Sequence, residues 1–375
     1  MSLVQHVRLF FFICLVSVLI FSCSNNTVET LSEIRTHDSI LNPIQSLGKR
    51  LFFDASLSNP IGQSCASCHS PGNGFVDPGI HPVSAGALKH LFGSRNAPSI
   101  SYAAFTPYFH YDSLNKEYVG GLFWDGRVNT LAEQAVQPLL NHLEMNNSNR
   151  TTIIERIKKS AYRDLFLSVF GSNSLADTNK AFVCVTEAIE EYEETKEVNP
   201  FTSKFDYYLA GKVQLSKPEI RGLKLFEDST KGNCAACHPN KPDKFTNAVL
   251  FTDYTYDNLG LPANPEIAAL CKENKCDAGL GFIVKQKSAD GKFKVPTLRN
   301  VAVTAPYFHN GVIKTLLDAV RFYNERDAGK FGPPEVAENV NKKELGDLKL
   351  NEQEVGDIVA FLETLTDGYK GEMKK

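Results

Sequence analysis

The fold of this chain depends on the stretch Cys65-Ala66-Ser67-Cys68-His69, which recurs in the second half as Cys234-Ala235-Ala236-Cys237-His238. The pattern C-x-x-C-H is typical of covalent attachment of a c-type haem. Two cysteines three residues apart lie on one side of a helical turn, so both thiols can bind one porphyrin while the adjacent histidine binds its iron. A thioredoxin-like redox pair or half of a zinc site also contains two cysteines, but neither requires a histidine after each pair. The sequence therefore predicts two covalently bound haem c groups.

Matching segments flank the two motifs in the same order, which indicates an internal duplication. A short amphipathic segment precedes each motif, at 48–54 and at 222–228. A Pro-Tyr-Phe-His sequence follows each motif, at 107–110 and at 306–309. The sequence therefore predicts a mostly α-helical protein of two cytochrome-c-like haem domains with long loops.

Hydrophobic periodicity predicts the main helices of both halves. One helix is expected over 151–170, another over 179–198 and a last one over 350–364. Ser216, followed by proline and then by glutamate at the third position, predicts a capped helix start. Threonine can cap the helix that follows a glycine turn in each half, as at Thr130. No run alternates long enough to predict a sheet.

The first 23 residues are expected to be a bacterial lipoprotein signal. Arg8 precedes an apolar run at 9–21 that is too short to span a bilayer comfortably. Ser22 then precedes Cys23, which we expect to carry the lipid. Ordinary signal cleavage and an uncleaved anchor are the alternatives. Because c-type haem is attached outside the cytoplasm, the signal agrees with the motifs and predicts a periplasmic protein. Ser24 after Cys23 resembles the pattern of outer-membrane sorting, so we expect an anchor in the outer membrane.

Composition excludes some classes of function and accounts for the other cysteines. A net charge of −3 argues against nucleic acid and against a polybasic membrane surface, so only the lipid anchor is expected to touch a membrane. Cys271 and Cys276 could close a small disulfide loop in an oxidising compartment, and Cys184 is expected to be an inert buried thiol. The predicted parts are a signal at 1–23, a polar tether at 24–46, an N-terminal haem domain at 47–199 and a C-terminal haem domain at 200–375.

Taken together, the motifs resemble the bacterial di-haem cytochrome c peroxidase and MauG family from about residue 47 to residue 365. Each motif is modest alone, but their order and spacing are specific. The resemblance implies that the N-terminal domain reacts with peroxide and that the C-terminal domain transfers electrons. The motifs that carry it are Cys65 to His69, Arg95-Asn96-Ala97-Pro98, Phe123-Trp124-Asp125-Gly126-Arg127, Glu144-Met145, Cys234 to His238, Pro296-Thr297-Leu298-Arg299-Asn300 and Thr304-Ala305-Pro306-Tyr307-Phe308-His309.

The resemblance also assigns residues to the first haem. His69 is its proximal ligand, as His238 is for the second haem. Glu144 corresponds to the distal carboxylate, helped by Gln134, and Pro138 shapes the pocket; a solvated loop carboxylate and a helix surface amide are the plainer readings. The region around the two nearby histidines, His81 and His90, resembles family members that lack a removable distal histidine. We therefore expect the first haem to be open and high-spin at rest.

Two aromatic residues are assigned by the same resemblance. Trp124, the only tryptophan, corresponds to a residue that lies between the haems and relays electrons, although a buried core aromatic is the simpler reading. Tyr323 stands where the well-known peroxidases carry the methionine that binds the second haem, and MauG has tyrosine there. A phenolate favours oxidised iron, whereas a thioether raises the potential. Tyr323 could instead only pack on its helix.

A calcium ion between the domains is also implied, because Asn96, Thr304 and Pro306 match the family positions that hold it. Oxygen donors suit a hard cation, and turn formation is the alternative for Asn96 and Thr304.

Three functions follow from these features. The first is a peroxidase that reduces hydrogen peroxide with electrons from a small cytochrome c or copper protein. The second is a MauG-like oxidase that modifies side chains of a partner protein, and the third is a non-catalytic electron carrier. A homodimer is compatible with the resemblance, because family peroxidases are often dimers.

Overall fold

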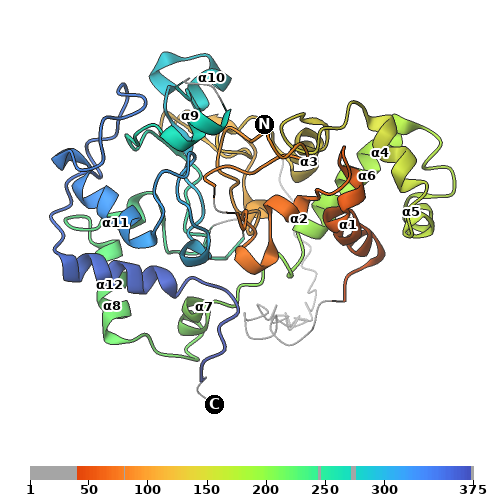
Figure 1. The fold of residues 1–375 in the computed structure, drawn as a ribbon. Coiled ribbons are helices and arrows are strands. Elements are labelled where there is room, and N and C mark those ends of the chain that lie inside the picture. The colour runs from red at the N-terminus through yellow and green to blue at the C-terminus, as the bar shows by residue number, and fades with distance from the viewer. Residues whose placement is uncertain (1–39, 80, 244–245, 272–275, 373–375) are drawn as a thin grey trace, which may run out of the picture. The chain divides into compact units, whose positions relative to one another are not determined.

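The computed structural model describes residues 40–79, 81–243, 246–271 and 276–372, all of which belong to one compact unit, Ser39–Lys375. The predicted signal, Cys23 and most of the predicted tether lie outside the described residues. The described part is mostly helical with long loops, as the sequence predicts (Figure 1). Its α-helices are α1 Pro43–Phe53, α2 Cys65–Cys68, α3 Leu131–Leu140, α4 Arg150–Ile157, α5 Arg163–Phe170, α6 Thr178–Glu193, α7 Lys204–Leu209, α8 Lys217–Glu227, α9 Pro265–Cys271, α10 Leu280–Val284, α11 Leu316–Glu325 and α12 Glu352–Glu363.

The first hydrophobic core forms where α1 and α3 pack on α6. Phe52, Phe166 and Phe182 are almost completely buried in it. The two helices α1 and α6 cross closely at Gly48, where an added Cβ would lie 1.7 Å from the carbonyl oxygen of Ala188. Only glycine permits this approach without moving the backbone.

The second hydrophobic core forms where α8 packs on α12, and it contains the aromatic rings of Phe226, Phe251 and Phe361. A glycine again permits the crossing, since a Cβ on Gly222 would lie 1.9 Å from the carbonyl oxygen of Asp357. The segments that the sequence pairs at 48–54 and 222–228 thus hold the same kind of close helix crossing in each half. The duplication itself and the boundary between 199 and 200 stay predictions.

Side-chain caps confirm the predicted helix starts. Thr130 accepts a hydrogen bond from the backbone N–H of Glu133 at the start of α3. Ser216 and Glu219 form a reciprocal capping box at the start of α8. Such caps satisfy backbone donors that the first turn leaves without partners.

The predicted helix over 151–170 is wrong in one respect, because it is two helices, α4 and α5. Ser160 donates to the carbonyl of Ile157 at 2.8 Å after the end of α4, and Tyr162 donates to the carboxylate of Asp54 at the start of α5. The helix predicted over 179–198 begins one residue earlier and ends at Glu193.

Strands are few and short among the described residues. Strand β1 (His110–Asp112) pairs with β2 (Glu117–Val119), and β3 (Tyr256–Asp257) pairs with β4 (Phe293–Lys294), both antiparallel. These ribbons are too short for an alternating pattern to reveal. In the described part of the chain, no helix has the length and apolar character needed to cross a membrane.

Candidate haem sites

The first C-x-x-C-H motif forms a helical turn, as the attachment chemistry requires. Helix α2 carries Cys65 and Cys68, and His69 follows it directly. The Nδ1 atom of His69 lies 3.2 Å from the carbonyl oxygen of Phe75. Burial lowers the pKa of His69, because desolvation disfavours the charged imidazole. A neutral ring held through Nδ1 leaves Nε2 to bind a metal.

The second motif repeats this arrangement on a tighter turn. Cys234 begins a 3₁₀ turn, Cys234–Ala236, and Cys237 and His238 follow it. His238 Nδ1 lies 2.8 Å from the carbonyl oxygen of Phe251. Burial lowers the pKa of His238 to about 4, so this ring is neutral at physiological pH. Both histidines are therefore prepared as metal ligands by the same backbone contact.

The first cavity brings together residues that lie far apart in the sequence. Its volume is about 1190 Å³, and Cys65, Cys68 and His69 form one part of its lining. Helix α3 contributes Gln134 and Pro138, and the loop after α3 contributes Glu144. The structure thus places the predicted distal residues in the same cavity as the first attachment motif.

Glu144 has the environment of a proton-exchanging group. Asn141 donates to its Oε1 atom at 3.1 Å, which fixes the orientation of the carboxyl. Burial raises the pKa of Glu144, while the Asn141 contact and the charge of Arg127 oppose that shift. A carboxyl with a raised pKa is a better proton acceptor, which suits a group that accepts and returns a proton.

Glu193 is a second carboxyl on this cavity, and sequence reasoning missed it. It ends α6, is 4% exposed, and its Oε2 atom has no hydrogen-bond partner among the described residues. Burial, reinforced by the charge of Glu190, raises the pKa of Glu193 to about 8. Its acidic neighbours in the sequence hid it, because such a run usually marks a solvated helix face.

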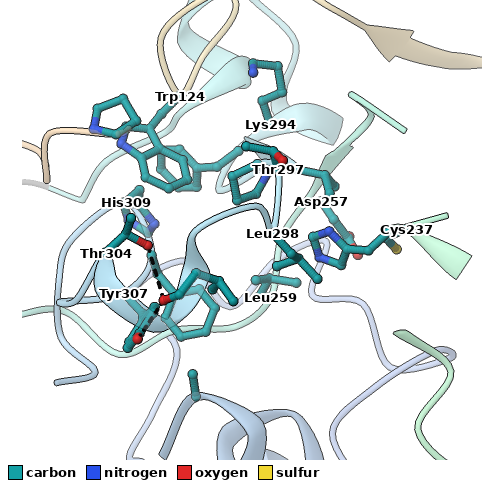
Figure 2. A pocket seen from close by; sticks show the side chains of 18 of the residues that line it. Trp124, Cys237, Asp257, Leu259, Lys294, Thr297, Leu298, Thr304, Tyr307 and His309 are labelled. Atoms are coloured by element: carbon teal, nitrogen blue, oxygen red, sulfur yellow. Dashed lines mark hydrogen bonds between the residues drawn. The ribbon is translucent and has the colours of Figure 1, made fainter. Parts of the chain in front are cut away.

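The second cavity is lined by Cys234, Cys237 and His238 together with Tyr323 from α11. Figure 2 shows part of its lining, including Cys237. The Tyr323 ring packs between aromatic neighbours, with its centre 5.9 Å from that of Phe308. Burial is the main cause that raises the pKa of Tyr323, and the nearby thiols and Asp257 add to it. The phenol therefore faces the pocket in which the resemblance expects an axial ligand.

Trp124 lies on the wall that the two cavities share, since it lines both. Its Nε1 atom donates to the carbonyl of Asn96 at 2.9 Å, and its own carbonyl accepts from the backbone N–H of Lys294 at 2.8 Å. His309 also lines both cavities, is 5% exposed and stacks on Phe293 with ring centres 3.6 Å apart. Figure 2 shows Trp124 and His309 together on one side of the second cavity.

The predicted calcium positions are brought together on the wall of the second cavity. Asn96 Nδ2 donates to the carbonyl of Pro306 at 3.0 Å, and Thr304 Oγ1 donates to the carbonyl of Val301 at 3.3 Å. The calcium ion itself stays a prediction.

The two histidines near the first haem motif and the three remaining cysteines contact other parts of the chain. His81 Nδ1 lies 3.0 Å from Glu266 Oε1, and neither His81 nor His90 is among the residues that line the first or the second cavity. Cys271 Sγ lies 3.4 Å from the carbonyl oxygen of Gly93, and Cys276 Sγ lies 3.4 Å from that of Glu335. A disulfide between these two cysteines stays a prediction. Cys184 is half-buried against the first core, and burial raises its thiol pKa.

The residues that line both cavities are those that hold a covalently bound haem. Each one presents two thiols on a single turn and a neutral imidazole, with Glu144 in the lining of the first cavity and Tyr323 in the lining of the second. The donor set of each site is that of a c-type haem.

The chain is similar to known proteins along nearly all of its length. A model of the di-haem cytochrome c peroxidase family matches residues 43–214. The methylamine utilization protein MauG of Paracoccus denitrificans is 39% identical over 362 residues, covering 90% of this chain and 91% of MauG. Cytochrome c551 peroxidase of Pseudomonas aeruginosa is 34% identical, covering 83% of this chain and 80% of the peroxidase.

A solved structure supports the same relationship. The di-haem peroxidase BthA from Burkholderia thailandensis superposes with a TM-score of 0.77 at 34% identity, covering 87% of each chain. These similarities show that the chain belongs to the di-haem cytochrome c peroxidase and MauG family of oxidoreductases, whose members bind two haem c groups.

Proposed function

We propose that this protein is a peroxidase that reduces hydrogen peroxide to water with electrons from a small periplasmic redox protein. The observation that carries the proposal is the presence of Glu144 and Gln134 in the same cavity as Cys65, Cys68 and His69. A bound haem would supply an iron that binds peroxide and accepts electrons. His69 would hold that iron from the proximal side.

Glu144 would move the proton that O–O cleavage requires. In its ionised form it would accept a proton from one oxygen of hydrogen peroxide and return it to the other. Asn141 donates to Oε1 of Glu144 and so restricts the rotation of the carboxyl group. The other oxygen, Oε2, is left to exchange the proton. Gln134 lines the same cavity and would orient peroxide with its side-chain amide.

Trp124 would carry electrons between the two haems. Its indole lines both cavities, and its hydrogen bond to Asn96 fixes the ring in the shared wall. An anchored aromatic ring at that place shortens the distance an electron must cross. The donor protein would bind near the second haem.

A MauG-like oxidase is the second candidate, and Tyr323 favours it. Tyr323 lines the second cavity, and as an iron ligand its phenolate would favour oxidised iron over reduced iron. The similarity to MauG of Paracoccus denitrificans agrees with this reading. Such an enzyme would modify side chains of a partner protein instead of accepting electrons from a cytochrome.

Three further elements of the proposal rest on the sequence. Cys23 would carry a lipid that anchors the protein to the periplasmic side of the outer membrane. Asn96, Thr304 and Pro306 would hold calcium. The protein could function as a homodimer.

The test is oxidation of reduced cytochrome c by hydrogen peroxide, with Glu144→Gln as the informative variant. Loss of a positioned acid/base group is expected to lower turnover by about 10²–10⁴-fold. Glu187→Gln, an exposed carboxyl on α6, is the matched control and is expected to behave like the wild type.

Each outcome separates the candidates. Turnover that depends on Glu144 supports a peroxidase. Peroxide consumption without oxidation of any cytochrome or copper protein would favour the MauG-like oxidase. A protein that exchanges electrons but consumes no peroxide would be an electron carrier, and the proposal would be wrong.

A further inference from the structure

Lys294 is a cationic side chain on the wall of the second cavity, and the proposed reaction does not use it. It ends β4, and its backbone N–H donates to the carbonyl of Trp124 at 2.8 Å. Figure 2 shows it on the same side of the cavity as Trp124. Burial alone lowers the pKa of Lys294 to about 8, and no nearby carboxylate opposes that shift.

The other charged groups on this wall have partners in the protein. Arg299 binds both carboxylate oxygens of Asp206, at 2.9 and 3.1 Å. Asp277 accepts two hydrogen bonds from Arg95. Among the described residues, Lys294 has no ion pair, and it makes a cation–π contact with Tyr254, with Nζ 5.9 Å from the centre of the ring.

An unpaired ammonium group in such a place is costly unless something else supplies a negative charge. Asp257, another carboxylate on this wall, is engaged by Asn341 and shows no interaction with Lys294. Because no described carboxylate pairs with Lys294, a group that fills the cavity is the remaining source of the negative charge. A haem c attached through Cys234 and Cys237 carries two propionate carboxylates, the kind of group that pairs with a lysine ammonium.

We propose that Lys294 binds a propionate of the second haem, and that it thereby positions that haem against Trp124 and sets its reduction potential. The inference rests on haem binding by the family and not on the identity of the substrate. A cation paired with a propionate cancels negative charge near the iron. Because oxidised iron carries one more positive charge than reduced iron, Lys294 favours the reduced state.

The experiment is a redox titration of the purified di-haem protein, followed by absorption and EPR, for the wild type, Lys294→Gln and Lys294→Arg. Lys294→Gln is expected to shift the potential of the second haem to more negative values and to move that of the first haem less. Lys294→Arg keeps the charge and is expected to restore the wild-type potential. Lys287→Gln removes an equal charge from an exposed position in the same half and is the matched control.

A second readout reports the contact directly. Resonance Raman bands of propionate bending are expected to shift in Lys294→Gln and to stay in place in Lys287→Gln. A pyridine haemochrome assay first verifies that each variant holds both haems. If Lys294→Gln with full haem content keeps both the wild-type potential and the wild-type Raman bands, the propionate contact does not exist. Peroxide turnover plays no part in this result, so it can fail while the proposed function stands.

Discussion

The two haem regions share one way of holding an imidazole and differ in what faces it. In the N-terminal region, His69 belongs to a cavity with two carboxyls of raised pKa, those of Glu144 and Glu193. In the C-terminal region, His238 shares its cavity with the phenol of Tyr323. Carboxyls can exchange protons with a substrate, whereas a buried phenol offers an axial ligand. The two regions therefore share the residues that attach a haem. They differ in the other residues of the cavity lining, which we expect to determine what each haem does.

The largest effect is expected on the free energy of unfolding, in a variant that alters the second hydrophobic core and leaves the first one unchanged. Phe361 is completely buried and lies among other aromatic rings, with its centre 5.1 Å from that of Phe226. Phe361→Ala is expected to lower the free energy of unfolding by about 3–5 kcal/mol, because it leaves a cavity in the second core. Phe282, which is 77% exposed, gives the control variant Phe282→Ala.

Denaturant unfolding followed by haem absorption checks this prediction. Loss of only the second haem environment at low denaturant would show that the two regions unfold separately. An equal effect of Phe361→Ala and Phe282→Ala would contradict the packing described here.

The next effect concerns the unpartnered carboxyl of the first region. The pKa of Glu193 is about 8 in the folded chain, above its ordinary value of 4.5, so folding binds a proton there between these pH values. Its contribution to stability is present below the lower value and is lost as pH rises through the higher one.

Glu193→Gln removes this loss, so the variant is expected to become more stable than the wild type as pH rises toward 8. The difference should reach a few kcal/mol, since one pKa unit corresponds to about 1.4 kcal/mol. Unfolding curves at pH 5 and at pH 8 measure it, and a constant difference between wild type and variant would show that Glu193 does not titrate in this range.

A smaller energetic effect is expected where the two regions meet. Trp124→Ala should retain both haems and slow peroxide turnover by at least about tenfold, or about 1.4 kcal/mol of activation free energy. Stopped-flow reduction of the first haem through the second reports the electron-transfer step itself. Unchanged turnover would remove Trp124 from the mechanism.

The smallest effect is expected for Tyr323, in the lining of the second cavity. Tyr323→Phe keeps the ring and removes only the hydroxyl, so both haems should stay attached. If the phenol binds iron, absorption and EPR of the second haem should change while the first haem keeps its spectrum. Identical spectra of wild type and variant would mean that Tyr323 only packs on α11.

Local signals in the sequence predicted the features that depend on neighbouring residues. The attachment turns and the caps at Thr130 and Ser216 are confirmed for this reason. The break between α4 and α5 could not be predicted, because Tyr162 contacts Asp54, more than a hundred residues away in the chain. The β ribbons depend on equally distant partners, such as the pairing of Tyr256 with Lys294.

The site residues that belong to sequence motifs could be predicted. Those whose role depends only on their position in the folded chain could not. Gln134, Glu144 and Trp124 line the cavities that the resemblance implies. Glu193 and Lys294 belong to no such motif, and their charged side chains suggest a solvated surface. Only the three-dimensional structure shows that both lie on cavity walls without a carboxylate or ammonium partner among the described residues.

The most direct test of the contrast between the two regions is the EPR spectrum of the purified ferric protein, with and without fluoride. The account predicts a high-spin signal from the haem at His69 that changes when fluoride binds, and a low-spin signal from the haem at His238 that does not change. Two low-spin signals that are both insensitive to fluoride would contradict it.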